Sequence, residues 1–166
     1  MISAADILKE HKATLLGAGS DNEFHLTVQR RHLFHDSVKG VRHLNDPSKH
    51  FKVIFVGEPG VDEGGPRREF FHLFLAELGN QGTLFTGPPE KRVLLHNTMA
   101  LERGDFFAAG KLIGLSLIHG GPGPHFFAPS TAKYLLGMDA KDLNVDPDEV
   151  ADLGTLELVK KVRMLS

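Results

Sequence analysis

A glycine-rich turn with three carboxylates is the first stretch of this sequence that could do chemistry. Residues 57–65 (GEPGVDEGG) lie between an apolar run and a phenylalanine-rich run. Phosphate-binding loops occupy such places between a strand and a helix. This turn lacks the Gly-Lys-Ser/Thr ending, however, and Glu58, Asp62 and Glu63 would repel phosphate. It also lacks the spacing of a calcium loop. A nucleotide-binding enzyme is therefore only a remote alternative.

Ten histidines raise the question of a metal site. His32 and His35 are three residues apart with Asp36 adjacent, and His119 and His125 flank a glycine-proline loop. Zinc usually takes a third and a fourth protein ligand, and no spacing here completes such a set. No nucleophile-elbow pattern of a serine hydrolase is present either. We therefore expect no metal, no cofactor and no catalytic residue in this chain.

Composition narrows the class of protein further. The 166 residues contain no cysteine, which excludes disulfides, thiolate metal sites and a cysteine nucleophile in this chain. The formal charge of -2 argues against broad binding to nucleic acid or to anionic membranes. The N-terminus lacks a signal-peptide pattern and no apolar run is long enough to span a bilayer. We expect an intracellular protein, cytoplasmic or nuclear, of one domain plus an arm.

The elements around the turn predict a structural role for it. Residues 51–56 have apolar side chains on both faces, which predicts a strand that is covered on both sides. Pro66 suits the first turn of a helix whose apolar positions bury a wide face, namely Phe70, Phe71, Phe74, Leu75 and Leu78. Arg67 and Arg68 oppose the dipole of that helix, so we expect Glu58, Asp62 or Glu63 to pair with them as a clasp.

The rest of the chain predicts an α+β fold in which helix dominates. Helical patterns cover residues 4–16 and 30–44, a short strand covers 25–29, and a hairpin joins 83–86 to 92–96. Residues 104–119 are nearly apolar all round, which predicts a central core helix. Gly110 and Gly114 lie four apart within it, and we expect another backbone to approach that face closely. Downstream, the sequence predicts helix caps at Ser130 or Thr131, at Asp139 and at Asp146, a break at 154–155, and a last helix bearing Leu156, Val159 and Val162.

Several short motifs follow one another along the chain in a fixed order, and it is this order that identifies a family. Their residues are Gly57, Glu58, Gly60, Asp62, Gly64, Gly65, Arg68, Glu69, Phe70 and Phe71, then Phe106, Gly110 and Gly114. Upstream lie Arg30, Arg31, Asp36 and Ser37, and downstream lies the run from Tyr134 to Gly137. Together these motifs resemble the HECT ubiquitin-protein ligase domain over about residues 24–165. The match falls within the large subdomain of the N-terminal lobe.

This resemblance implies that different parts of the family's domain bind the conjugating enzyme and transfer ubiquitin. HECT ligases bind a ubiquitin-conjugating enzyme through an inserted subdomain, and a cysteine in a C-terminal lobe carries ubiquitin to a substrate lysine. The matched residues belong to neither part, and a thioester needs a thiolate that this chain does not have.

We therefore expect residues 1–23 to form a helical arm and linker, and residues 24–166 to be a partial N-lobe. Such a lobe would be a scaffold of a ubiquitin-protein transferase and would not be catalytic by itself. The chain could be a piece of a longer ligase or a naturally truncated binding or dimerisation module. Both alternatives predict exposed apolar surface and self-association. In the intact protein the expected partners are a ubiquitin-conjugating enzyme, ubiquitin and protein substrates.

Overall fold

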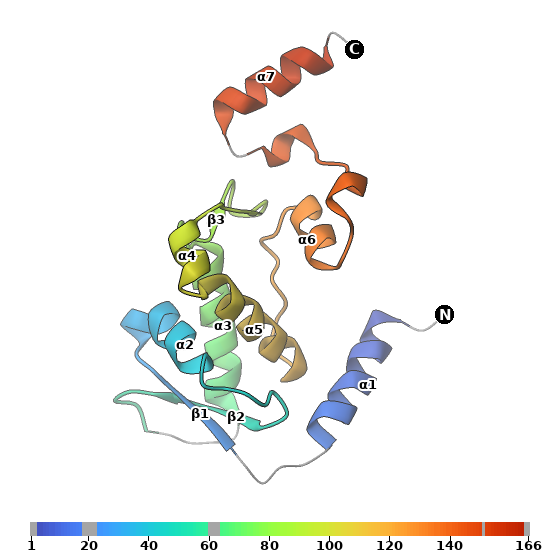
Figure 1. Cartoon of the computed structure of the whole chain (residues 1–166). Coiled ribbons are helices and arrows are strands. Elements are labelled where there is room, and N and C mark those ends of the chain that lie inside the picture. Colours follow the sequence, from blue (N-terminus) through green and yellow to red (C-terminus); the bar gives the residue numbers. More distant parts are fainter. Residues whose placement is uncertain (1–2, 18–22, 60–63, 151, 165–166) are drawn as a thin grey trace. The chain divides into compact units, whose positions relative to one another are not determined.

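The computed structural model describes residues 3–17, 23–59, 64–150 and 152–164, and it confirms a predominantly helical α+β fold. The chain divides into two compact units: residues 1–78 with 101–123, and residues 79–100 with 124–166. The elements in Figure 1 are, in order, α1 (Ala4–Gly17), β1 (Glu23–Val28), η1 (Arg30–His32), α2 (Leu33–Val41), β2 (His50–Phe55), α3 (Gly65–Gly79), β3 (Phe85–Thr86), β4 (Val93–Leu94), α4 (Thr98–Glu102), α5 (Asp105–Ile118), α6 (Pro129–Leu135), η2 (Ala140–Asp142), η3 (Pro147–Glu149) and α7 (Leu153–Arg163).

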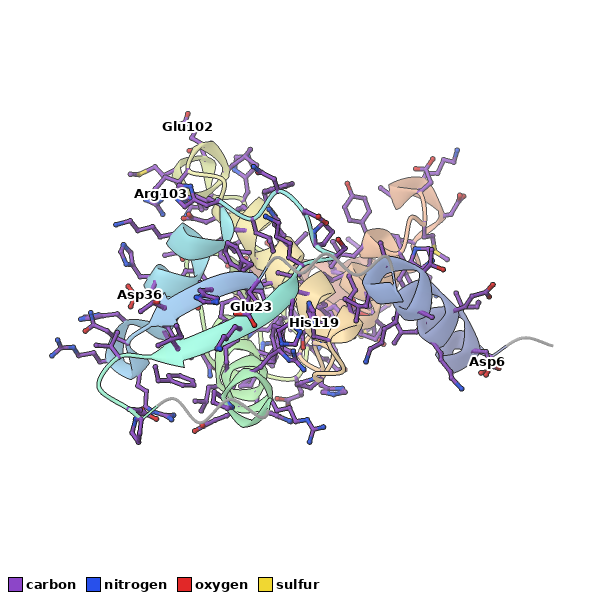
Figure 2. The ribbon with its side chains drawn as sticks, turned by 90° about the horizontal axis from the view of Figure 1, so that it is seen from below. Asp6, Glu23, Asp36, Glu102, Arg103 and His119 are labelled. Atoms are coloured by element: carbon purple, nitrogen blue, oxygen red, sulfur yellow. The ribbon has the colours of Figure 1, made fainter. Side chains whose placement is uncertain are left out.

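The first unit is built on a two-stranded parallel sheet. β1 and β2 pair in the register Leu26–Val53 and Val28–Phe55, and α2 forms part of the crossover between them. Figure 1 shows α2, α3 and α5 on one face of this sheet. Figure 2 views the sheet from the opposite face, with the strands in front of the helices. Within the described part of the first unit, α2, α3 and α5 therefore cover only one of the two faces.

This arrangement corrects the expectation that β2 is covered on both sides. The inward residues Phe51, Val53 and Phe55 are buried as predicted, but Ile54 is only half-buried and Val56 is exposed. Apolar side chains on both faces indicated two covering layers, whereas the described helices supply one. The outward face of β2 retains apolar side chains that meet solvent.

A cluster of phenylalanine rings forms the core beneath the sheet. Phe51 from β2 lies 5.6 Å from Phe71 between ring centroids, and Phe70 lies 5.8 Å from Phe74. All four rings are at most 1% exposed, which confirms the predicted buried face of α3. Stacked and tilted aromatic pairs at such distances add stabilisation beyond area burial.

The long apolar helix is confirmed, but only part of its surface is core. Ala108, Leu112 and Leu115 of α5 are buried, whereas Phe107 on another side is 73% exposed. At Gly110 and Gly114 no atom lies within 4 Å of where a Cβ would stand. The expected close approach of a backbone at these glycines is therefore wrong, because among the described residues that side of the helix faces open space.

The second unit contains the predicted hairpin in a shorter form. β3 and β4 pair antiparallel, with Phe85 opposite Leu94. The Arg92 N–H donates to the Phe126 carbonyl over 2.7 Å, which ties the hairpin to the chain that leads into α6. Phe85 packs against Phe126 and Phe127 at ring distances of 5.5 and 5.6 Å. This unit thus has an aromatic cluster of its own.

The caps of the last helices confirm some predictions and correct others. Asp139 and Asp146 each accept a backbone N–H two residues ahead and start η2 and η3, as predicted. The cap of α6 is Ala128, so neither Ser130 nor Thr131 caps that helix as we expected. The last helix is not broken at residues 154–155, because Asp152 caps it by accepting the Thr155 N–H over 2.7 Å.

Candidate functional site

The residues of the predicted signature lie at both ends of the connection between β2 and α3, and in α5. Gly57 and Glu58 follow β2, Gly64 and Gly65 open α3, and Arg68, Glu69, Phe70 and Phe71 occupy its first turns. Gly60, Asp62 and Glu63 fall outside the described residues. Gly57 and Gly64 have φ of 84° and 81°, a backbone conformation that favours glycine. Phe106, Gly110 and Gly114 lie apart from this turn, on α5.

Arg30 is the centre of the ion-pair network at this turn. Its Nε and Nη2 donate to the two carboxylate oxygens of Glu58 over 2.5 and 2.9 Å. Its Nη1 donates to Glu69 Oε1 over 2.8 Å, and the guanidinium lies 4.3 Å above the Phe55 ring centroid. One side chain of η1 therefore holds the segment that follows β2 to the N-terminal part of α3. We call Arg30, Glu58 and Glu69 the Arg30 clasp.

The electrostatics of the Arg30 clasp are those of a surface ion pair. The hydrogen bonds from Arg30 lower the pKa of Glu58, and those to Glu58 and Glu69 raise the pKa of Arg30. The three side chains are between 43% and 49% exposed, so solvent screens the attraction. The bidentate geometry fixes orientation more than it adds stability.

The clasp was expected with different cations. Glu58 pairs with Arg30 and not with Arg67 or Arg68, which corrects that part of the prediction. The other two acids named as partners lie outside the described residues. Arg67 instead directs Nη1 to the Phe51 carbonyl at 3.4 Å. Sequence separation explains the error, because Arg30 is 28 residues from Glu58 and no local pattern links the two.

Asp36, beside the histidine pair, makes a contact with the backbone. Asp36 Oδ2 accepts the Gln29 N–H over 2.9 Å, which lowers the pKa of the carboxyl group. His35 lies 3.4 Å from the other oxygen and is mostly exposed. Among the described residues, no group of three histidines and carboxylates could hold a metal ion. Asp36 therefore fixes the corner between β1 and α2.

His119 is a buried imidazole whose surroundings disfavour a charge. It follows α5, its ring lies 5.8 Å from that of Phe51, and its Nε2 has no partner in the described structure. Burial lowers the pKa of His119 to about 4, with smaller contributions from Arg67, His50 and Lys12. Figure 2 labels it beside the strands. His125, on the other side of the glycine-proline loop, is exposed.

Two anchors of α5 were not predicted from the sequence. Arg42 Nη2 and Arg103 Nε donate to the two oxygens of the nearly buried Asp105, over 3.0 and 2.9 Å. Lys111 donates to the carbonyls of Val41 and Leu44, at the end of α2, where a cation also meets the favourable end of the helix dipole. The contacts of Arg42 and Lys111 join residues more than 60 positions apart, and only the Arg103 contact is local. Apolar periodicity alone could not reveal such long-range contacts.

The second unit contains a buried carboxylate that was also missed. Glu149 is 5% exposed and accepts both the N–H and the hydroxyl of Ser130. It thereby pairs a backbone N–H group in the first turn of α6, which the cap residue Ala128 cannot do because it has no side-chain acceptor. No catalytic arrangement of nucleophile, base and oxyanion donors is formed by these residues.

No family model matches the chain. Individual relatives do match. The G2/M phase-specific E3 ubiquitin-protein ligase of Gallus gallus is 30% identical over 165 residues, which is 96% of this chain and 21% of that protein. Its Homo sapiens counterpart is 29% identical over 144 residues, 82% of this chain and 20% of that protein. The probable E3 ubiquitin-protein ligase HERC4 of Homo sapiens is 34% identical over 96 residues, 55% of this chain and 9% of that protein.

The chain thus spans about a fifth of the first two relatives and less of the third. None of the described helices is long and apolar enough to cross a membrane. Similarity over nearly the whole chain, to ligases from several vertebrates, agrees with the order of motifs in the sequence. The chain is therefore homologous over most of its length to E3 ubiquitin-protein ligases.

Proposed function

We propose that this chain is the large subdomain of a HECT N-lobe, with residues 1–23 as an arm and residues 24–166 as the lobe. Three features support the proposal: the ordered motifs, the ligase relatives, and the Arg30 clasp that joins two of those motifs. Glu58 and Glu69 are both signature residues, and one arginine holds both. The signature then acts as a brace between β2 and α3.

In this proposal the chain is a scaffold of a ubiquitin-protein transferase inside the cell, cytoplasmic or nuclear. The observation that carries the non-catalytic role is the absence of cysteine from all 166 residues. A ubiquitin thioester requires a thiolate, so in this proposal the acceptor lies outside these 166 residues. The proposed partners in the intact ligase are a ubiquitin-conjugating enzyme, ubiquitin and protein substrates.

A charging assay tests the non-catalytic role. The chain is incubated with activating enzyme, a charged conjugating enzyme and labelled ubiquitin, and the products are resolved with and without reductant. We expect no reductant-sensitive adduct on this chain, whereas a ligase of the same family with its cysteine forms one. An adduct on this chain that reductant removes would overturn the proposal.

Exposed apolar side chains favour a second role, as a dimerisation module. In the second unit Leu158 is 63% exposed and Val162 is 64% exposed. Exposed apolar patches recruit partners, so we propose that the chain self-associates in solution.

A nucleotide-binding enzyme remains the remote alternative. Isothermal titration with ATP and Mg²⁺ tests it, since saturable heat would support that alternative against ours.

A further inference from the structure

The last helix, α7, has an apolar face that the described residues leave exposed. Leu158 and Val162 lie four apart on one side of the helix and are 63% and 64% exposed, with Val159 beside them. The sequence pattern predicted this amphipathic helix, but it did not predict that the apolar side would face outward. A helix of 11 residues is marginal in water unless an apolar face is packed.

Polar contacts fix which side of α7 faces the rest of its unit. Asp152 caps the first turn, and Lys160 Nζ lies 4.0 Å from Asp148 of η3. These contacts hold the Lys160 side of the helix against η3. Leu158 and Val162 lie on a different side, so the same contacts keep them pointing outward.

The charges beside this face indicate what covers it. Glu157 and Lys161 are four apart and border Leu158, with the acid nearer the start of the helix and the base nearer its end. When two copies of α7 pack antiparallel, the Glu157 of each copy meets the Lys161 of the other copy. The pair of helices therefore has two such contacts. Parallel packing about a two-fold axis would instead place this flank of the two helices on opposite sides of the pair, where Glu157 of one copy cannot meet Lys161 of the other.

We propose that α7 is the interface through which two copies of this chain associate, as an antiparallel helix pair with Leu158 and Val162 at its centre. This inference rests on the self-association proposed above and names its surface. The two-fold axis makes both Glu157–Lys161 contacts equivalent. One pair of short helices buries less than a standard interface, so the dimer is weak.

Sedimentation velocity from about 10 µM to 1 mM tests the interface. We expect the wild-type mass to rise from 18.2 kDa to twice that value. Leu158→Glu should weaken association at least tenfold. Leu136→Glu is the matched control, because it places the same charge on another exposed leucine of the same unit, and it should leave association unchanged. Unchanged circular dichroism establishes that both variants fold.

Charge exchange tests the antiparallel arrangement. Glu157→Lys should weaken the dimer, and adding Lys161→Glu should restore it, because the opposite charges again face each other. Failure of the double variant to restore association overturns the antiparallel register. Wild-type-like association of Leu158→Glu, or loss of association in Leu136→Glu, overturns the α7 interface but leaves self-association standing. A wild-type monomer at every concentration overturns both, and none of these results bears on the charging assay.

Discussion

The phenylalanine cluster allows a quantitative prediction for Phe74→Ala. Phe74 is 0% exposed and lies 5.8 Å from Phe70 and 6.2 Å from Phe34, between ring centroids. A buried phenylalanine removes on the order of 150 Å² or more from water, which is worth about 4 kcal/mol at 25 cal/mol per Å². The cavity that alanine leaves adds to this loss. We expect the free energy of unfolding to fall by about 3–5 kcal/mol.

Urea unfolding followed by circular dichroism measures this loss. Phe107→Ala is the matched control, since it makes the same truncation where the ring is 73% exposed on α5. The control should change the free energy of unfolding by less than about 0.5 kcal/mol. A Phe74→Ala variant as stable as the Phe107→Ala variant would refute the assignment of the buried face of α3. The slope of the free energy of unfolding against urea concentration should be the same for both variants. A changed slope would indicate that the two units no longer unfold together.

Three further predictions address charge and backbone. Arg30→Ala should lower the melting temperature slightly, and the difference from wild type should shrink in high salt, because the Arg30 clasp is exposed; an equal difference at both salt concentrations would contradict a screened pair. His119 has a folded pKa of about 4, below its usual value of 6.5, so the unfolded chain binds more protons and stability should fall as the pH drops from about 6.5 to 4. In urea titrations, His119→Phe should flatten that part of the pH profile of the free energy of unfolding. An unchanged profile would contradict the assignment of this pH dependence to His119. Gly110→Ala should raise stability by about 1 kcal/mol because nothing crowds its helical position, whereas Gly104→Ala should lower it because Gly104 has φ of 72°.

Local patterns predicted the elements of this fold because they act over a few residues. The apolar positions of α3, the Asp caps of η2 and η3, and the apolar run of α5 each reflect the period or the end of one element. The same patterns could not tell how many layers cover a strand. Val56 and Ile54 are apolar, yet the described helices lie on the other face of the sheet.

The candidate site was harder to predict because its contacts cross the sequence. Arg30 reaches Glu58 and Glu69, and Arg42 reaches Asp105, over 28, 39 and 63 positions. Single-sequence reasoning assigned Glu58 to the nearest arginines, which is the best local choice and the wrong one. The resemblance includes both Glu58 and Glu69 among its motif residues, but it did not predict that Arg30 joins them.

The first unit is discontinuous along the chain, and this affects how it is made. Residues 79–100 lie between its two segments, so α5 reaches α2 only after the hairpin has been synthesised. At about 5–20 residues per second, the 39 residues from the end of α3 to the end of α5 take roughly 2–8 s to be synthesised. During that interval the end of α2 lacks its contact with Lys111, and Phe51 has the rings of α3 beside it but not the ring of His119. The nascent chain therefore passes through a stage in which part of the core of the first unit is open to chaperones or to aggregation, before α5 closes the unit.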